Sequence, residues 1–245
     1  LLNTIGIGGV EILLSKLSRY ENILALPGQN FGLFKKNLYR VHYYRNLNAS
    51  EIFESLSKEL YTNEGKLWMG LTKHMTLKEK NNYDQQKHKI EFKKEIKESK
   101  EFLDAVKAYI KSFYISYNYP GKADYYTWFS NNVLLNHGEY KNFSEKVKVI
   151  HMTYTISRWL TVISQFRTWD CKNACKFWII NNLYAKYYIK KNHDKGVFIY
   201  TENLISSSNQ ILNEVFNTLN IKNIIPKNQN YPVGGFLNLN LDIIN

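Results

Sequence analysis

Hydrophobic and polar positions alternate along the chain in blocks that predict strands and helices in turn. A short apolar run over residues 2–7 is followed, at about residues 11–19, by a helical pattern with its apolar side chains on one side: Ile12, Leu13, Leu14 and Leu17. A second apolar run ends at Pro27-Gly28, where a turn is expected. The N-terminal stretch therefore predicts a strand, a helix and a second strand.

The middle of the chain is mainly helical in pattern. Residues 52–60 form an amphipathic helix behind a Ser50 cap, and residues 102–117 form another that stops before Pro120-Gly121. Between them, residues 72–100 are rich in Lys and Glu and favour a solvated helix or a mobile lid. This stretch separates the opening unit from the second half of the chain.

The second half repeats the alternation of strands and helices. Residues 147–154 are β-branched and apolar and predict a central strand, and residues 196–204 predict another. Helices are expected over residues 157–169, 174–191 and, after a cap at Ser206 to Ser208, 209–219. Strands alternating with helices of this length predict a single α/β domain over residues 1–245, with a parallel sheet covered on both faces.

Charge narrows the classes of partner. The 245 residues carry a formal net charge of +12, which favours acidic ligands such as nucleotides, nucleic acid, sulfated or phosphorylated substrates, or an anionic membrane. Abundant Lys and Asn together also fit a coding sequence poor in G and C, which discounts this inference. No apolar run reaches the length of a membrane span, so we expect none.

The two cysteines indicate reduced thiols rather than a metal site. Cys171 and Cys175 are four residues apart in a helical stretch and therefore lie on one face, where a disulfide would constrain little. Two ligands alone do not make a zinc site, and no spacing of His and Cys completes one. We expect no metal, and the thiols fit a reducing compartment such as the cytoplasm.

Three glycines stand between the first strand and the first helix, at Gly6, Gly8 and Gly9. Glycines at such a junction let the backbone approach an anion and direct N–H groups of the helix start toward it. The stretch lacks the Gly-Lys-Ser/Thr of a Walker loop, and Glu11 occupies the place of the last glycine of a dinucleotide fingerprint. A phosphate-binding loop and a plain tight turn both remain open.

Three landmarks in this order resemble the sulfotransferases that use 3'-phosphoadenosine 5'-phosphosulfate (PAPS). They are IGGVEILL near the N-terminus, VIHMTYTISRWLTVISQF in the middle, and VFIYTENLISSSNQILNEVFNTLNI near the end. The resemblance implies a P-loop NTPase-like architecture and transfer of a sulfuryl group from PAPS, without a metal, to a hydroxyl of a glycan or another small acceptor. The alternative is a catalytically inactive relative that binds a polyanion or a protein partner.

The resemblance also implies the residues that bind the donor. The 5'-phosphosulfate would lie on the backbone of Gly6, Gly8, Gly9, Val10, Glu11 and Ile12, and the 3'-phosphate on Thr153, Arg158 and Thr161. Gly234 and Gly235 would form a late loop over the nucleotide.

Several of these positions depart from the family pattern. Ile7 stands where the family has Lys or Arg, Val10 where it has Thr, Thr153 where it has Arg, and Thr161 where it has Ser. The missing charge could come from Arg158 or Arg167 at the 3'-phosphate and from Lys35 or Lys36 at the 5' end.

Histidines supply the candidate bases. His42, in YRVHYYR, is the predicted catalytic base, because it lies about where the resembled family has its acceptor-side residues. Gln29 is the nearest match to the Glu that glycan-specific members use as base, and it cannot take a proton. His74 and His137 rank next and lie on expected loops. His151 is expected in the core, and His88 and His193 on the surface.

Aromatic residues make up 15% of the chain, and most of them are expected in the core. The spacing of Trp159, Trp169 and Trp178 favours core packing. Tyr125, Tyr126 and Trp128 lie beside a turn and are candidates to line an acceptor cleft.

Overall fold

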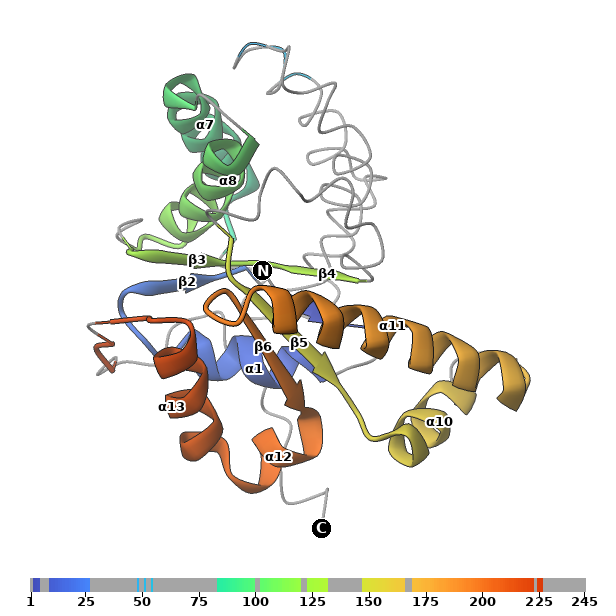
Figure 1. Cartoon of the computed structure of the whole chain (residues 1–245). Helices are drawn as coiled ribbons and strands as arrows, with labels where there is room; N and C mark the ends of the chain where they lie inside the picture. Colours follow the sequence, from blue (N-terminus) through green and yellow to red (C-terminus); the bar gives the residue numbers. More distant parts are fainter. Residues whose placement is uncertain are drawn as a thin grey trace. The chain divides into compact units, whose positions relative to one another are not determined.

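A computed structural model gives the fold. It describes residues 2–4, 9–26, 48, 51, 54, 83–99, 102–119, 123–131, 147–165, 169–222 and 224–226 (Figure 1). The chain forms two compact units. The first comprises Leu1–Leu13 with Phe129–Asn223, and the second Leu14–Trp128 with Ile224–Asn245. The single domain expected from the sequence stays a prediction, and each unit is treated by itself below.

The first unit is built on a parallel sheet of short strands. Its strands are β1 (Leu2–Thr4), β4 (Phe129–Asn131), β5 (Val149–Thr153) and β6 (Gly196–Tyr200), in the order β4-β1-β5-β6. Leu2 pairs with Phe129 on one side and with Ile150 on the other, and Ile150 pairs in turn with Val197. The parallel sheet and α/β class predicted from the sequence are confirmed.

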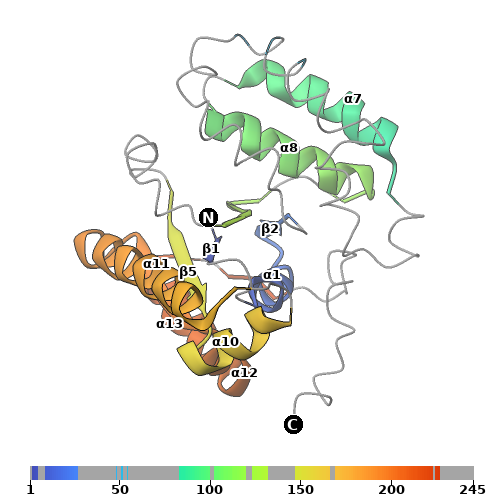
Figure 2. The same ribbon diagram turned by 90° about the vertical axis from the view of Figure 1, so that its right-hand side faces the viewer.

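Helices follow three of these strands. They are α1 (Val10–Leu17), α10 (Ile156–Ser164), α11 (Cys171–Lys191), α12 (Thr201–Ser206) and α13 (Ser208–Thr218). Every residue of β5 is buried, as expected for an apolar strand with a neighbour on each side. Figure 2 shows α11 beside β5.

Polar bonds and close packing fix α11 on the sheet. The Asn182 Oδ1 atom lies 2.9 Å from Nε2 of His151, in the middle of β5. The Trp178 Nε1 group donates to the carbonyl of Tyr154, 3.1 Å away. Gly196 packs so closely against Ile189 that a Cβ there would come within 2.8 Å of Ile189 Cγ1. The opposite face of α11 consequently points away from the sheet.

The second unit contains a helical hairpin and a strand pair. The helices α7 (Gln85–Glu95) and α8 (Phe102–Ser116) are joined through the 3-10 turn η2 (Ile96–Glu98). The strands β2 (Ile23–Ala25) and β3 (Tyr125–Thr127) pair in parallel. The Tyr114 hydroxyl ties α8 to β2, because it donates to the Ala25 carbonyl at 2.9 Å and accepts from the Ala25 N–H at 3.0 Å.

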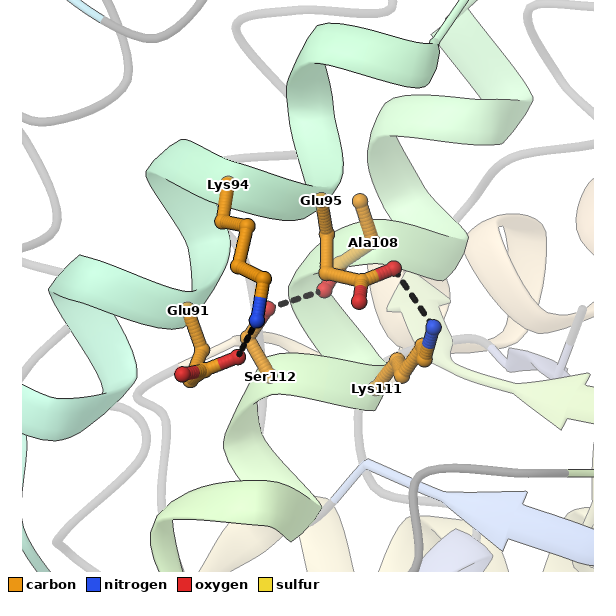
Figure 3. A network of polar contacts seen from close by, with 6 residues as sticks. All are labelled: Glu91, Lys94, Glu95, Ala108, Lys111 and Ser112. Atoms are coloured by element: carbon orange, nitrogen blue, oxygen red, sulfur yellow. Dashed lines mark hydrogen bonds and ion pairs between the residues drawn. The ribbon is translucent and has the colours of Figure 1, made fainter.

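The hairpin of α7 and α8 carries charged pairs (Figure 3). The Lys111 Nζ atom lies 2.6 Å from a carboxylate oxygen of Glu95 and joins α8 to α7. Lys94 and Glu91 form a looser pair at 3.7 Å within α7. The Ser112 hydroxyl donates to the Ala108 carbonyl at 2.7 Å, so this side chain is satisfied within its own helix.

The expectation that His88 lies on the surface is wrong. It is fully buried in α7, with its Nδ1 atom 2.5 Å from the Tyr83 hydroxyl and its Nε2 atom 3.2 Å from the Tyr109 carbonyl. Burial lowers the pKa of His88 from 6.5 to about 3. The described part of the predicted solvated stretch, residues 83–99, thus contributes to a core, because His88, Phe92 and Ile96 form one inward face.

Other boundaries also differ from expectation. The helix expected over residues 157–169 ends at Ser164, and Trp169 is 36% exposed rather than part of the core, unlike Trp159. The strand expected to reach residue 204 ends at Tyr200, because the next residues form α12. Near residue 50, Asn48 and Glu51 exchange two hydrogen bonds at 2.8 and 3.0 Å, and the predicted cap Ser50 lies outside the described residues.

The strands β3 and β4 both lie within the aromatic stretch of residues 125–131. Tyr125 and Tyr126 are half-buried in β3, and Trp128, just after it, is buried. Their predicted role in an acceptor cleft stays a prediction.

Candidate functional site

Three strand-to-helix junctions of the first unit lie at one edge of its sheet. The junctions are β1 to α1 through Gly9, β5 to α10 through Tyr154 and Thr155, and β6 to α12 at Thr201. Because the strands are parallel, their carboxyl ends share an edge, which is where open α/β sheets bind ligands. We refer to Gly9, Tyr154, Thr155, Thr201 and Glu202 as the junction cluster.

Gly9 occupies a position that requires glycine. Its φ of 67° lies in the left-handed region that residues with a Cβ rarely adopt. A Cβ at Gly9 would overlap Cγ2 of Thr201 and lie 3.2 Å from the Tyr154 hydroxyl oxygen. The backbone before α1 therefore packs directly against the ends of β5 and β6.

Thr201 links these strand ends. It is fully buried, and its hydroxyl donates to the Thr153 carbonyl at 3.3 Å. Its methyl group faces Gly9. One side chain thus connects all three junctions.

Glu202 fixes the start of α10. Its Oε1 atom accepts from the Thr155 N–H at 3.0 Å and from the Thr155 hydroxyl at 2.8 Å. Within the part of the chain that the structure describes, its Oε2 atom is buried and has no hydrogen-bond partner. A buried carboxylate oxygen without a donor is costly and is a common feature of functional sites.

Neither α1 nor α10 receives a side-chain cap from the described residue that precedes it. Gly9 has no side chain to offer, and the Thr155 hydroxyl bonds Glu202 instead of the first turn of α10. Uncapped N–H groups at a helix start favour a bound anion. The junction cluster can therefore present backbone donors to a phosphate or sulfate group.

Arg158, on the exposed side of α10, is the described basic residue closest in sequence to the junction cluster. Arg158 and Thr161 are both exposed and lie one turn apart on the same helix. The Thr161 hydroxyl donates to the Ser157 carbonyl at 3.0 Å, a bond that it would have to give up in order to donate to a phosphate oxygen. A guanidinium beside a hydroxyl suits a phosphate group.

The structure brings together some predicted site residues and not others. Gly9 and Thr153 both contact Thr201, and Arg158 and Thr161 share a helix face. Thr153 itself is fully buried, and its hydroxyl donates to the Tyr154 carbonyl at 3.1 Å. A phosphate contact by this side chain would first have to break that bond, so its predicted role is energetically costly.

Val10 and Ile12 point into the core, so only their backbone could contact a ligand. The remaining predicted positions lie outside the described residues: Gly6, Gly8, Lys35, Lys36, His42, Arg167, Gly234, Gly235 and the Glu11 side chain.

Sequence reasoning missed four members of the junction cluster: Tyr154, Thr155, Thr201 and Glu202. A signal was present, because hydroxyl-bearing residues follow the apolar part of both predicted strands: Thr-Tyr-Thr at residues 153–155 and Tyr-Thr at residues 200–201. Carboxyl ends of parallel strands meet at one edge, so these groups could have been placed together.

Other candidate groups have structural partners. His151 is a core histidine as predicted, and burial lowers its pKa to about 4. His193 is exposed, also as predicted. The thiols of Cys171 and Cys175 lie 4.0 Å apart. Among the described residues, no three His, Cys, Asp or Glu side chains gather as metal ligands would.

The elements define a mixed α/β protein with helices around short parallel strands. No family model matches the chain, and no curated protein matches it. In the described part of the chain, none of the helices combines the length and the apolar character required to cross a membrane.

Proposed function

We propose that this chain binds PAPS at the junction cluster and transfers its sulfuryl group to a hydroxyl of a glycan or another small acceptor. The observation that carries the proposal is the packing of Gly9, at the start of α1, against Thr201 and Tyr154. This packing brings an uncapped helix start, a glycine with positive φ and the ends of two neighbouring strands to one point.

The topology of the first unit supports the same location. Starting from β1, the next strand of this sheet along the chain is β4, on one side of β1, whereas β5 leads to β6 on the other side. The carboxyl ends of β1 and β5 thus flank a topological switch point, the usual ligand site of an open α/β sheet.

Each part of the donor has a proposed partner. The 5'-phosphosulfate accepts from backbone N–H groups at the start of α1. The 3'-phosphate accepts from Arg158 on α10, which supplies the charge that Thr153 lacks, and from Thr161 once its hydroxyl turns away from the Ser157 carbonyl. Glu202 does not touch the nucleotide and instead holds Thr155 and the start of α10 in place.

The proposed reaction is an in-line displacement at sulfur. The acceptor oxygen forms a bond to sulfur while the bond from sulfur to the 5'-phosphate oxygen breaks. The acceptor proton passes to a base, proposed from the sequence to be His42, and the departing phosphate keeps the electron pair. Backbone N–H groups stabilise the charge that grows on the departing oxygen.

Removal of the Arg158 side chain tests this assignment. Loss of a charge-assisted pair costs about 1.5–3 kcal/mol, so Arg158→Ala should weaken binding of 3'-phosphoadenosine 5'-phosphate about 10- to 150-fold. Lys172→Ala is the matched control, because it removes one exposed positive charge from α11. Equal affinities of the two variants would contradict the assignment.

A second candidate is a non-catalytic relative that binds the nucleotide or a polyanion. The observation that favours it is Ile7, which stands where the resembled family has the basic residue that neutralises the departing phosphate. Transfer of labelled sulfate from PAPS to a panel of hydroxylated acceptors separates the two. Nucleotide binding without transfer would favour the non-catalytic relative.

A further inference from the structure

The outward face of α11 carries large apolar side chains in an unbroken row. Ile179, Ile180, Leu183, Tyr184 and Tyr187 are between 44% and 61% exposed. Spacings of three and four residues place them on neighbouring turns of one helix. We call this set the outer stripe. An exposed apolar patch of this kind normally marks an interaction surface.

The outer stripe is surrounded by positive charge. Lys172 and Lys176 precede it on the helix, Lys190 and Lys191 follow it, and Lys186 lies at its side. The sequence of α11 contains no Asp or Glu, and the nearest acidic residues, Asp170 and Asp194, lie beyond its two ends. The result is an apolar centre enclosed by ammonium groups.

The helix cannot turn this face inward. Its opposite side is held on the sheet by the bonds of Asn182 to His151 and of Trp178 to Tyr154, and by the contact of Ile189 with Gly196. The outer stripe is therefore a permanent feature of the folded first unit.

Charge argues against a second copy of the chain as the occupant. If two α11 helices paired through the outer stripe, lysines at the helix ends would face lysines in the parallel arrangement and in the antiparallel one. No carboxylate of the helix is available to offset this repulsion.

We propose that the outer stripe docks on an anionic lipid surface. An apolar centre with cations around it matches a bilayer interface, where acyl chains lie below negatively charged headgroups. Tyrosine suits this depth because its ring is apolar and its hydroxyl is polar, and lysine stems can lie along the apolar region while the ammonium groups reach the headgroups. The helix, about 31 Å long, lies along the surface and does not cross it.

Flotation with lipid vesicles tests the proposal. The full chain should float with vesicles of phosphatidylcholine and phosphatidylserine at low salt, and stay behind with phosphatidylcholine alone. Ile180→Gln with Leu183→Gln should weaken binding roughly 10-fold or more, because the apolar centre is lost. The matched control is Ile90→Gln with Ile205→Gln, which replaces two exposed isoleucines elsewhere and should leave binding unchanged.

Single lysine variants show whether vesicle binding depends on the lysines around the outer stripe or on the net charge of the whole chain. Lys176→Gln should weaken vesicle binding about five-fold, whereas Lys97→Gln, at an exposed lysine of η2, should have little effect. An equal loss in both variants would mean that the net charge of the whole chain attracts the vesicles, and the proposal would fail.

A fluorescent label reports insertion directly. In a chain with Cys171→Ser and Cys175→Ser, an environment-sensitive dye on Leu183→Cys should shift to shorter wavelength when anionic vesicles are added. The same dye on Ile90→Cys should not shift. An unshifted dye at position 183 on protein that floats with the vesicles would overturn the proposal, as would the absence of flotation. A dimer of the chain, detected by sedimentation and abolished by the Ile180→Gln and Leu183→Gln variant, would also overturn it.

Discussion

Gly9→Ala is expected to destabilise the first unit in a way that depends on one methyl group of Thr201. The left-handed φ of 67° costs an alanine about 1–2 kcal/mol. Overlap of the new Cβ with Thr201 Cγ2 adds about 1–3 kcal/mol. The reduced freedom of the unfolded chain offsets about 0.4–1 kcal/mol. The net loss of unfolding free energy is therefore about 1–5 kcal/mol.

Thr201→Ser removes the overlapping methyl group and keeps the hydroxyl that donates to Thr153. Alone it should cost about 1 kcal/mol of buried apolar contact. Combined with Gly9→Ala it should relieve the overlap, so the two substitutions should be coupled by at least about 1 kcal/mol in a double-mutant cycle.

Urea unfolding followed by far-UV circular dichroism measures the four corners of this cycle. Gly196→Ala supplies the control, because its Cβ would press on Ile189 at the opposite end of β6. Its effect should add to that of Thr201→Ser within about 0.5 kcal/mol. Additive behaviour of Gly9→Ala and Thr201→Ser would refute the close packing that defines the junction cluster.

Three further substitutions test separate contacts. Because the pKa of His88 falls from 6.5 to about 3 on folding, the unfolded chain takes up a proton that the folded chain does not. The contribution of neutral His88 to the free energy of unfolding is thus fully present above pH 6.5 and is lost as the pH falls toward 3. The loss is about 2 kcal/mol between about pH 7 and pH 5. His88→Phe should remove this part of the pH dependence in urea unfolding, and an unchanged slope would count against the burial. Asn182→Ala deletes the acceptor 2.9 Å from His151 and should cost about 1–3 kcal/mol in the same assay. Glu95→Gln removes the part-exposed pair with Lys111 and should cost less than about 1 kcal/mol, a difference that high salt should shrink.

The strands and helices whose buried residues are mainly apolar could be predicted from the sequence. The buried strand β5 lies within the predicted residues 147–154, because its β-branched and apolar residues Val149, Ile150 and Met152 are typical of a strand covered on both faces. Helix α13 was found from its single apolar face, of which Leu212, Val215 and Phe216 are buried. In these elements hydrophobicity and burial coincide.

Other elements could not be assigned correctly because hydrophobicity and burial diverge. In α11, Asn181 and Asn182 are buried, whereas Ile179, Ile180 and Leu183 are exposed. The buried Asn182 amide bonds His151 and the Trp178 carbonyl, partners that no pattern of apolar residues can reveal.

His88 was misplaced for a related reason. The charged residues around it indicated solvent, yet it shares one helix face with Phe92 and Ile96, and its ring nitrogens find partners in Tyr83 and Tyr109. The spacing of four residues between His88, Phe92 and Ile96 was a usable signal that the surrounding lysines obscured.

The candidate site could be predicted as a region but not in its contacts. Gly9, before α1, and Thr153, at the end of β5, were both predicted as site residues, and both contact Thr201 in the structure. The link between Gly9 and Thr201 depends on a long-range approach between residues far apart in sequence, which local patterns do not contain. The late strand also stops at Tyr200, so Thr201 and Glu202 belong to a helix start.

Calorimetric titration of the purified chain with 3'-phosphoadenosine 5'-phosphate, compared with adenosine 5'-phosphate and ATP, tests the central claim most directly. The proposed site predicts binding that weakens about 10-fold or more when the 3'-phosphate is missing, because the contact with Arg158 is then lost. Equal affinity for the three nucleotides, or no binding of any of them, would contradict the assignment of the junction cluster as a PAPS site.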